Sequence, residues 1–132
     1  MYKFQKFENR NARLENRISV TRSNSIGFPT QFYRNNNIKQ FKYVVLYYDQ
    51  DKKAIGIRFT NNEEDENKFS IIHSKKGFGG SIVTRSFFRT YNIDLKKYYG
   101  KYEWKKRAPE GIGQLFVIDL KEREIQNKDN VV

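Results

Sequence analysis

The chain repeats a stretch of its own sequence. Residues 32–38 read FYRNNNI, and residues 87–93, which lie 55 positions later, read FFRTYNI. The same spacing places Tyr43 over Tyr98 without a gap. A unit that recurs at such a period is a supersecondary element that buries its apolar face against a neighbouring copy. We therefore expect an internal duplication. The alternative is chance similarity in a chain rich in aromatic and Asn residues.

The first half of this duplication, residues 18–60, has the pattern of two strands, a helix and a hairpin. Alternating apolar and polar residues indicate the strands, and Pro29 suits the first position of a helix. The run at 35–37 (NNN) suits the end of that helix, because Asn tolerates the left-handed conformation. The expected elements are strands at 18–21 and 26–28, a helix between 29 and 37, and a hairpin of 41–48 with 54–59.

The second half, residues 68–120, shows the same order of elements after an acidic segment at 61–67 (NNEEDEN). We interpret that segment as a solvated linker, residues 1–17 as a basic and aromatic arm, and residues 121–132 as a tail. The expected elements are strands at 69–73 and 81–83, a helix at 84–91, and a final strand pair of 98–104 with 113–120. The expected core residues are Phe32, Ile38, Val45, Leu46, Ile55, Ile57, Phe87, Ile93, Val117 and Ile118.

A half of this size is too small to bury its own apolar faces well. Two halves with exposed sheet edges solve this problem by interlocking into one barrel-like core. The layout resembles the swapped-hairpin barrel of AbrB and MazE-type proteins: a strand, a turn, a strand ending at Phe28-Pro29, a helix closing on Asn37-Ile38, and a hairpin. In that family two subunits interleave and bind DNA.

The resemblance implies an α+β fold, mainly β, built from two tandem strand-strand-helix-strand-strand halves. One chain would then carry both copies, as a pseudo-dimeric monomer or a homodimer. Two departures concern the DNA-binding mode. The family shows a Gly-Asp pair entering its third strand, where this chain has Gln40-Phe41-Lys42. The second half has Val83-Thr84 where the first has Phe28-Pro29.

Composition narrows the class of partner. The 132 residues carry 26 Lys and Arg against 15 Asp and Glu, a net charge of +11. Such a charge favours a polyanion: duplex DNA, or else an acidic protein. The absence of Cys and the single His exclude disulfides, thiol chemistry and a poly-histidine metal site, so we expect no cofactor. The chain has no apolar run long enough for a membrane span and no secretory signal at its start, so we expect no membrane partner and a cytoplasmic location.

The candidate DNA-binding residues lie in two turns at equivalent places of the halves, in the two helices, and in the arm. The resemblance implies that basic residues around this turn and helix reach DNA. Exposed cations on paired turns can contact phosphates, while Arg22 or Asn24 can reach base edges. Arg34 and Arg89, which match across the repeat, could instead bind a carboxylate of the other half. The full set is Arg10, Arg13, Arg17, Arg22, Asn24, Arg34, Lys75, Lys76, Arg85 and Arg89.

We expect no catalysis. Asp94, Glu103 and Lys105 have the outline of a Mg²⁺-dependent nuclease site, but short motifs of this kind often match by accident. The tyrosines on the predicted strands are either core residues or a stacking platform for single strands. The sequence thus predicts a duplex-DNA-binding transcriptional or antitoxin-like regulator. The alternatives are a protein-interaction module such as a phage or mobile-element inhibitor, a single-strand binder, and a nuclease.

Overall fold

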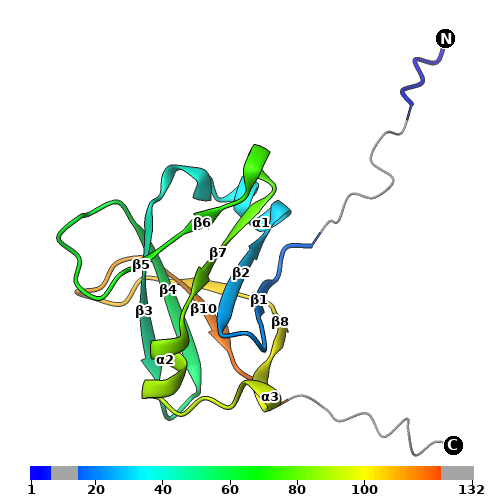
Figure 1. Cartoon of the computed structure of the whole chain (residues 1–132). Coiled ribbons are helices and arrows are strands. Elements are labelled where there is room, and N and C mark those ends of the chain that lie inside the picture. The colour runs from blue at the N-terminus through cyan, green and yellow to red at the C-terminus, as the bar shows by residue number, and fades with distance from the viewer. Residues whose placement is uncertain (7–14, 123–132) are drawn as a thin grey trace, which may run out of the picture.

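The fold is α+β and mainly β. The computed structural model describes residues 1–6 and 15–122, and within them ten strands form two five-stranded antiparallel sheets accompanied by three short α-helices (Figure 1). Sheet A has the order β6 (Ile72–His73), β7 (Gly79–Val83), β2 (Ser25–Pro29), β1 (Ile18–Val20), β8 (Gly100–Tyr102). Sheet B has the order β5 (Phe69–Ser70), β3 (Tyr43–Asp49), β4 (Ala54–Thr60), β10 (Leu115–Asp119), β9 (Lys105–Arg107).

The helices are single turns or little more. They are α1 (Thr30–Asn35), α2 (Arg85–Thr90) and α3 (Leu95–Tyr98), with 3-10 turns η1 (Ile38–Gln40) and η2 (Lys75–Gly77). The predicted helices at 29–37 and 84–91 are confirmed, although Pro29 is the N-cap of α1 and not its first helical residue. Tyr98, the first residue of the strand predicted at 98–104, instead ends helix α3, which the Asp94 side chain caps by accepting a hydrogen bond from the Lys96 amide. The predicted match of Tyr98 with Tyr43 is therefore wrong in structure, because Tyr43 begins strand β3.

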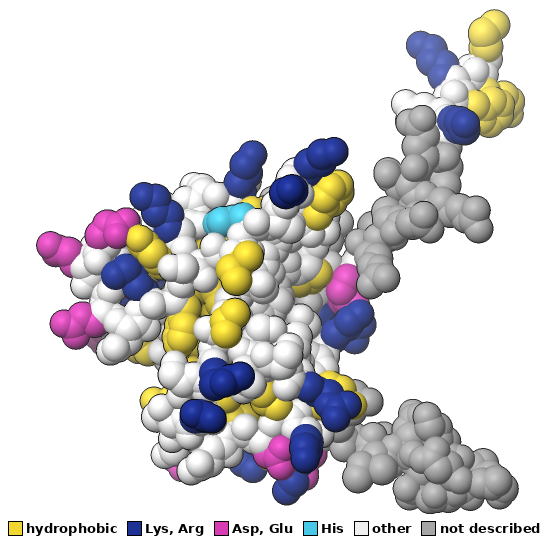
Figure 2. Space-filling model, in the orientation of Figure 1, with side chains coloured by type: hydrophobic (Ala, Val, Ile, Leu, Met, Phe, Trp, Pro, Cys, Tyr) yellow, Lys and Arg dark blue, Asp and Glu magenta, His cyan; other side chains and the backbone are white. Residues whose placement is uncertain are grey.

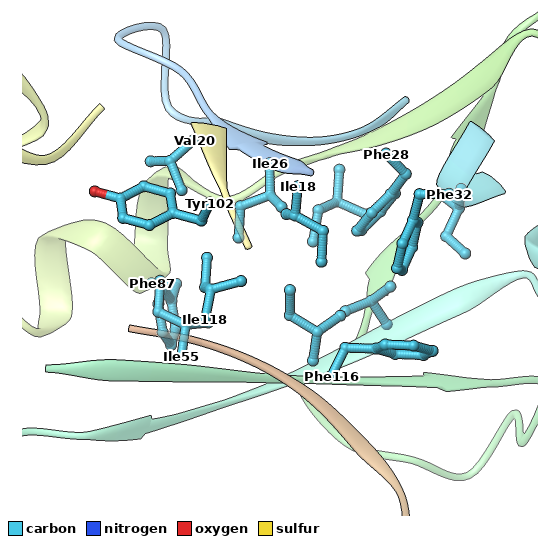
Figure 3. Close-up of a cluster of buried hydrophobic side chains, with 14 of the residues drawn as sticks. Ile18, Val20, Ile26, Phe28, Phe32, Ile55, Phe87, Tyr102, Phe116 and Ile118 are labelled. Atoms are coloured by element: carbon cyan, nitrogen blue, oxygen red, sulfur yellow. The ribbon is translucent and has the colours of Figure 1, made fainter. Parts of the chain in front are cut away.

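The core lies between the two sheets (Figure 3). Phe28 and Phe32 reach it from the side of sheet A, and Phe116 reaches it from sheet B. The Phe32 and Phe116 ring centroids are 5.1 Å apart in an edge-to-face arrangement, which aromatic pairs prefer. Seven of the predicted core residues are fully or nearly fully buried: Phe32, Ile38, Ile55, Ile57, Phe87, Ile93 and Ile118.

On strands β3 and β10, the residue next to the predicted core residue faces the core instead. Val45 and Val117 are only half-buried, whereas their neighbours Val44 and Phe116 are buried in the core cluster. Successive side chains of a strand point to opposite faces, so only one of two adjacent apolar residues can face the core. The sequence does not distinguish the two phases, because both residues of each pair are apolar.

The two halves pair strand to strand. β2 is antiparallel to β7, the second strand of the other half, and β4 is antiparallel to β10, the last strand of the other half. The first strand of each half also pairs with the third strand of the other: β1 with β8, and β5 with β3. Every sheet therefore contains strands from both halves, and neither half contains a sheet of its own.

The two main helices match in detail. α1 and α2 have six residues each, at the 55-residue spacing of the sequence repeat. Each is followed by an Asn in the left-handed region, Asn37 with φ of 50° and Asn92 with φ of 52°. The Asn37 amide donates to the Arg34 carbonyl at 3.2 Å, and the Asn92 amide donates to the Arg89 carbonyl at the same distance. The predicted use of Asn to end the first helix is confirmed, and Asn92 follows the second helix in the same conformation.

The strands do not close a barrel. The chain passes from sheet B to sheet A between β5 and β6, and from sheet A to sheet B between β8 and β9. The strand predicted at 69–73 is therefore broken in two. The strand predicted at 98–104 is shortened to β8 by the break before β9, and it pairs with β1 and not with the predicted partner at 113–120. Trp104, between β8 and β9, lies 5.3 Å from the Phe32 ring centroid, so the second break coincides with an aromatic side chain packed on the core.

The acidic segment 61–67 is hydrogen-bonded to sheet B. Asp65 pairs with Arg58 of β4 at 3.0 Å and accepts a hydrogen bond from the Thr60 hydroxyl at 2.8 Å. Glu63 accepts one from the Tyr43 hydroxyl at 2.7 Å. The segment connects the halves as expected, but two of its carboxylates, those of Glu63 and Asp65, bind side chains of sheet B.

Candidate nucleic-acid interface

Two hairpin turns of sheet A have the same construction. Turn 1 (residues 21–25) joins β1 to β2 and is closed by the Thr21 amide, which donates to the Ser25 carbonyl at 3.0 Å. Turn 2 (residues 74–79) joins β6 to β7 and is closed by the Ser74 amide, which donates to the Gly79 carbonyl at 2.9 Å. In both turns the hydroxyl of the first residue donates to that same carbonyl, at 3.4 Å and 2.8 Å.

Each turn is bonded to the start of the helix in the other half. The Thr84 amide, just before α2, donates to the Asn24 carbonyl of turn 1 at 2.8 Å. The Thr30 hydroxyl, at the start of α1, donates to the Phe78 carbonyl of turn 2 at 2.6 Å. Turn 1 therefore lies beside Arg85, the first residue of α2. These contacts join a basic turn of one half to a basic helix of the other.

The two turns lie at opposite ends of the ladder that joins β2 to β7. Its five residue pairs run from Ser25–Val83, next to turn 1, to Pro29–Gly79, next to turn 2. At about 3.4 Å per residue the ladder alone separates the turns by roughly 14 Å. In Figure 2, Lys and Arg side chains gather at both ends of this side of the molecule, with other residue types between them. The two turns are thus two separate basic groups.

Small residues form the floor between the two basic groups. The strand register places Lys101, Ser19, Gly27, Ser81 and Ile72 in one row across sheet A. A Cβ atom on Gly27 would lie 2.5 Å from the Ser19 Oγ, and one on Gly79 would lie 2.7 Å from the Phe28 carbonyl oxygen. A hollow of about 450 Å³ lies over this row. We call the outer surface of sheet A, with its two turns, the sheet A face.

One arginine near each turn lies over an aromatic ring. The Arg22 guanidinium lies 5.2 Å from the ring centroid of Tyr99, and that of Arg34 lies 5.5 Å from the ring centroid of Phe78. Arg34 also donates from Nε to the Gly77 carbonyl at 3.2 Å. The carboxylate predicted as its alternative partner in the other half is thus replaced by a backbone carbonyl. Arg89 is exposed in the last turn of α2.

Arg17 is neutralised by a neighbour on the same face. Glu15 pairs with Arg17 at 2.8 Å and with Lys101 at 3.4 Å. The hydrogen bonds from Arg17, first from its side chain and then from its backbone amide, lower the pKa of the Glu15 carboxyl to about 2. Residue 16 is also held, because Trp104 donates from its indole nitrogen to the Asn16 carbonyl at 2.8 Å. Arg10 and Arg13 lie outside the described residues.

The residues of the nuclease outline are not gathered at one site. Asp94 caps α3 and lines a hollow of about 290 Å³, whereas Glu103 lines a different hollow of about 410 Å³. Lys105 pairs with Asp119 at 3.1 Å. Within residues 1–6 and 15–122, no three His, Asp or Glu side chains are grouped as metal ligands.

The tyrosines do not form a continuous stacking surface. Tyr102 is buried in the core, Tyr48 packs on Tyr91, and the Tyr98 hydroxyl accepts a hydrogen bond from Lys53 at 2.9 Å. Phe78 is the exposed aromatic residue that lies among the predicted basic residues, with 59% of its surface accessible. Sequence reasoning missed it, although a Phe after Lys75-Lys76-Gly77 in a turn is itself an unusual placement. Glu15 and Lys101 were also missed, because their pairing is created by the β1–β8 contact.

None of the helices in the described part of the chain is long and apolar enough to cross a membrane. Comparison with known proteins gives no match, since no family model, no curated protein and no solved structure corresponds to this chain.

Proposed function

We propose that this chain binds double-stranded DNA through the sheet A face, without catalysis, as a transcriptional or antitoxin-like regulator in the cytoplasm. The observation that carries the proposal is the pair of basic turns at opposite ends of the β2–β7 ladder, each bonded to the helix of the other half. β2 and β7 are corresponding strands of the two halves, and they pair antiparallel. The two turns are therefore related by an approximate two-fold axis that passes near the central pair of this ladder, Gly27 and Ser81. The two backbones of duplex DNA have two-fold symmetry as well.

The dimensions of the face suit a duplex. The separation of roughly 14 Å between the turns is comparable with the major-groove width of about 12 Å. The cations Arg22 and Arg85 at one end, and Lys75 and Lys76 at the other, can therefore contact phosphates on two groove edges. The small floor allows the sugar-phosphate backbone to approach the sheet closely. Arg22 and Asn24 are the residues best placed to reach base edges.

The strand pairing also supports the proposed relation to swapped-hairpin proteins. In this proposal each half is one ancestral subunit, and the chain is the fusion of two. The exchange of first strands, β1 to β8 and β5 to β3, is the contact expected when two such units interleave. The duplication is also supported by the matched helices α1 and α2.

The test is a binding titration of duplex DNA over a range of salt concentrations. The triple variant Arg22→Ala, Lys75→Ala, Lys76→Ala should weaken binding, and each lost phosphate contact should lower the slope of log affinity against log salt by about 0.9. The melting temperature should change little, because all three side chains are exposed.

The matched control removes three positive charges elsewhere, as Lys105→Ala, Lys106→Ala, Arg107→Ala on the exposed strand β9. If the control weakens binding as much as the first triple, the attraction is diffuse and the sheet A face is wrong. If wild-type protein does not bind duplex DNA even at low salt, the proposed function fails.

A second candidate function is binding of an acidic protein, such as an inhibitor would require. It is favoured by Ile72 and Val83, which lie on sheet A with 56% and 58% of their surfaces accessible. Exposed apolar residues beside cations are typical of protein interfaces. If the partner is an acidic protein, the double variant Ile72→Ser, Val83→Ser should abolish binding. If the partner is duplex DNA, the variant removes no cation, so the salt slope of duplex binding should be unchanged.

A further inference from the structure

We propose that Phe78 stacks on a nucleobase at the turn 2 end of the sheet A face. The inference rests on the proposed function, because it assigns one contact of that same surface. The ligand chemistry is an accessible base carrying its own phosphates. Such a base comes either from an unpaired stretch or from a duplex step that the protein opens.

The backbone holds the Phe78 side chain in solvent. The Phe78 carbonyl accepts the Thr30 hydroxyl at 2.6 Å, which fixes the residue against α1. The next residue, Gly79, has φ of 129° and no room for a Cβ atom beside the Phe28 carbonyl. A ring that is 59% accessible on a backbone fixed from both sides cannot turn into the core without breaking these contacts.

Arg34 supports the ring from one side. Its guanidinium is held by the Gly77 carbonyl and lies 5.5 Å from the Phe78 ring centroid. A cation over an aromatic ring limits the positions of that ring and leaves the rest of it open. A flat partner can stack on the open part. Every nucleobase has such a flat π-face, so this contact requires no particular sequence.

The neighbouring charges identify the partner as a nucleotide. Lys75 and Lys76 precede Phe78 in the same turn and are exposed, and neither pairs with a carboxylate among the described residues. A base that stacks on Phe78 brings phosphates on both sides, within reach of these lysines. A purely apolar partner would not use the two cations.

Turn 1 has no aromatic residue at the position that corresponds to Phe78. The residue that corresponds to Phe78 in turn 1 is Asn24, since both carbonyls accept hydrogen bonds from the threonine at the start of the opposite helix. A short amide side chain can hydrogen-bond to a base edge but offers little area for stacking. Of the two corresponding turn residues, only Phe78 can therefore stack on a base.

The experiment measures affinity and salt slope for three substrates: a short paired duplex, the same duplex with one unpaired base, and a single strand. Phe78→Ala should weaken binding by roughly 5- to 100-fold wherever a base is accessible, with the salt slope unchanged. Phe78→Trp should retain wild-type affinity. The control is Val117→Ala, a truncation of a half-buried apolar residue on β10 of sheet B, away from the sheet A face, which should bind as wild type does.

The substrates distinguish the two sources of the base. A loss confined to the unpaired substrates identifies an unpaired base. A loss on the paired duplex as well, together with loss of protein-induced bending in a fluorescence energy-transfer assay, identifies an opened duplex step. Either result supports stacking by Phe78.

Two results would overturn the inference and leave the proposed function intact. One is wild-type affinity of Phe78→Ala on all three substrates while duplex binding remains salt-dependent. The other is wild-type behaviour of Phe78→Leu, since an apolar but non-planar side chain cannot stack. Phe78→Leu and Phe78→Trp also decide the question if Phe78→Ala fails to fold, which its melting curve would show. Absence of binding by the wild-type protein would instead refute the proposed function.

Discussion

The outer surfaces of the two sheets differ in how their charges are used. On sheet B, Arg58, Lys105 and Lys42 each pair with a carboxylate, at 3.0, 3.1 and 3.6 Å. On sheet A, the turn cations Arg22, Lys75, Lys76 and Arg85 have no such partner among the described residues. Sheet B also has large residues on its outer side, whereas the centre of sheet A has Ser and Gly.

The chain has a net charge of +11, and the difference lies in where its cations are paired with carboxylates. Two carboxylates of the acidic segment 61–67 bind side chains of sheet B, whereas the cations of the sheet A turns have no carboxylate partner among the described residues. Exposed surface ion pairs contribute little to stability, but they remove cations from the set available to a polyanion. Sheet A is the candidate interface for this reason.

The largest effect, on the free energy of unfolding, should come from substitutions in the core that both sheets share. Phe32→Ala and Phe87→Ala should each lower the free energy of unfolding by about 3–5 kcal/mol, measured by denaturant titration. Phe32 should be the more costly, because its ring is fully buried and contacts aromatic residues of both sheets, whereas Phe87 is 7% exposed. Equal losses of unfolding free energy would contradict this ranking and would show that Phe32 and Phe87 contribute equally to the core.

A smaller effect, on affinity for duplex DNA, should follow from increasing the number of unpaired cations on the sheet A face. Glu15→Gln should release Arg17 and Lys101, the two cations of the sheet A face that Glu15 now neutralises. Affinity for duplex DNA should rise, and the salt slope should steepen by about 0.9 for each cation that gains a phosphate. Glu110→Gln, the same charge change in the exposed loop between β9 and β10, is the control. An equal gain in the control would mean that only total charge matters.

The smallest effect should come from loosening the acidic segment on sheet B. Asp65→Asn should lower the melting temperature at neutral pH, because it removes the partner of Arg58 and Thr60. The hydrogen bond from Arg58, followed by that from Thr60, lowers the pKa of the Asp65 carboxyl below its ordinary value of 3.8. Its contribution is therefore complete above that value and is lost as the pH falls through the lowered pKa.

The difference in melting temperature between wild type and Asp65→Asn should accordingly shrink in acid. Glu64→Gln makes the same charge change on a neighbouring exposed side chain and should leave the melting temperature unchanged. A difference that persists at the lowest pH would contradict the role of the ionised carboxylate.

Much of the secondary structure could be predicted from the sequence. The strands at 18–20, 25–29 and 54–60 follow from local alternation, and the ends of α1 and α2 follow from Asn in a left-handed position. The break within the strand predicted at 69–73 and the change of sheet between β8 and β9 could not be predicted. They depend on which sheet each part joins, and that choice is a contact between residues far apart in the chain.

The candidate site, like the fold, could be predicted from the sequence only in part. The sequence by itself determines that two basic turns exist at equivalent places, because alternation, turn residues and charge are local properties. Only the tertiary structure decides that the turns lie at opposite ends of one ladder, that Arg17 is paired with Glu15, and that Phe78 is held out beside Arg34. The physical reason is that strand pairing fixes which distant residues meet, and the period-two pattern of a strand is compatible with more than one partner.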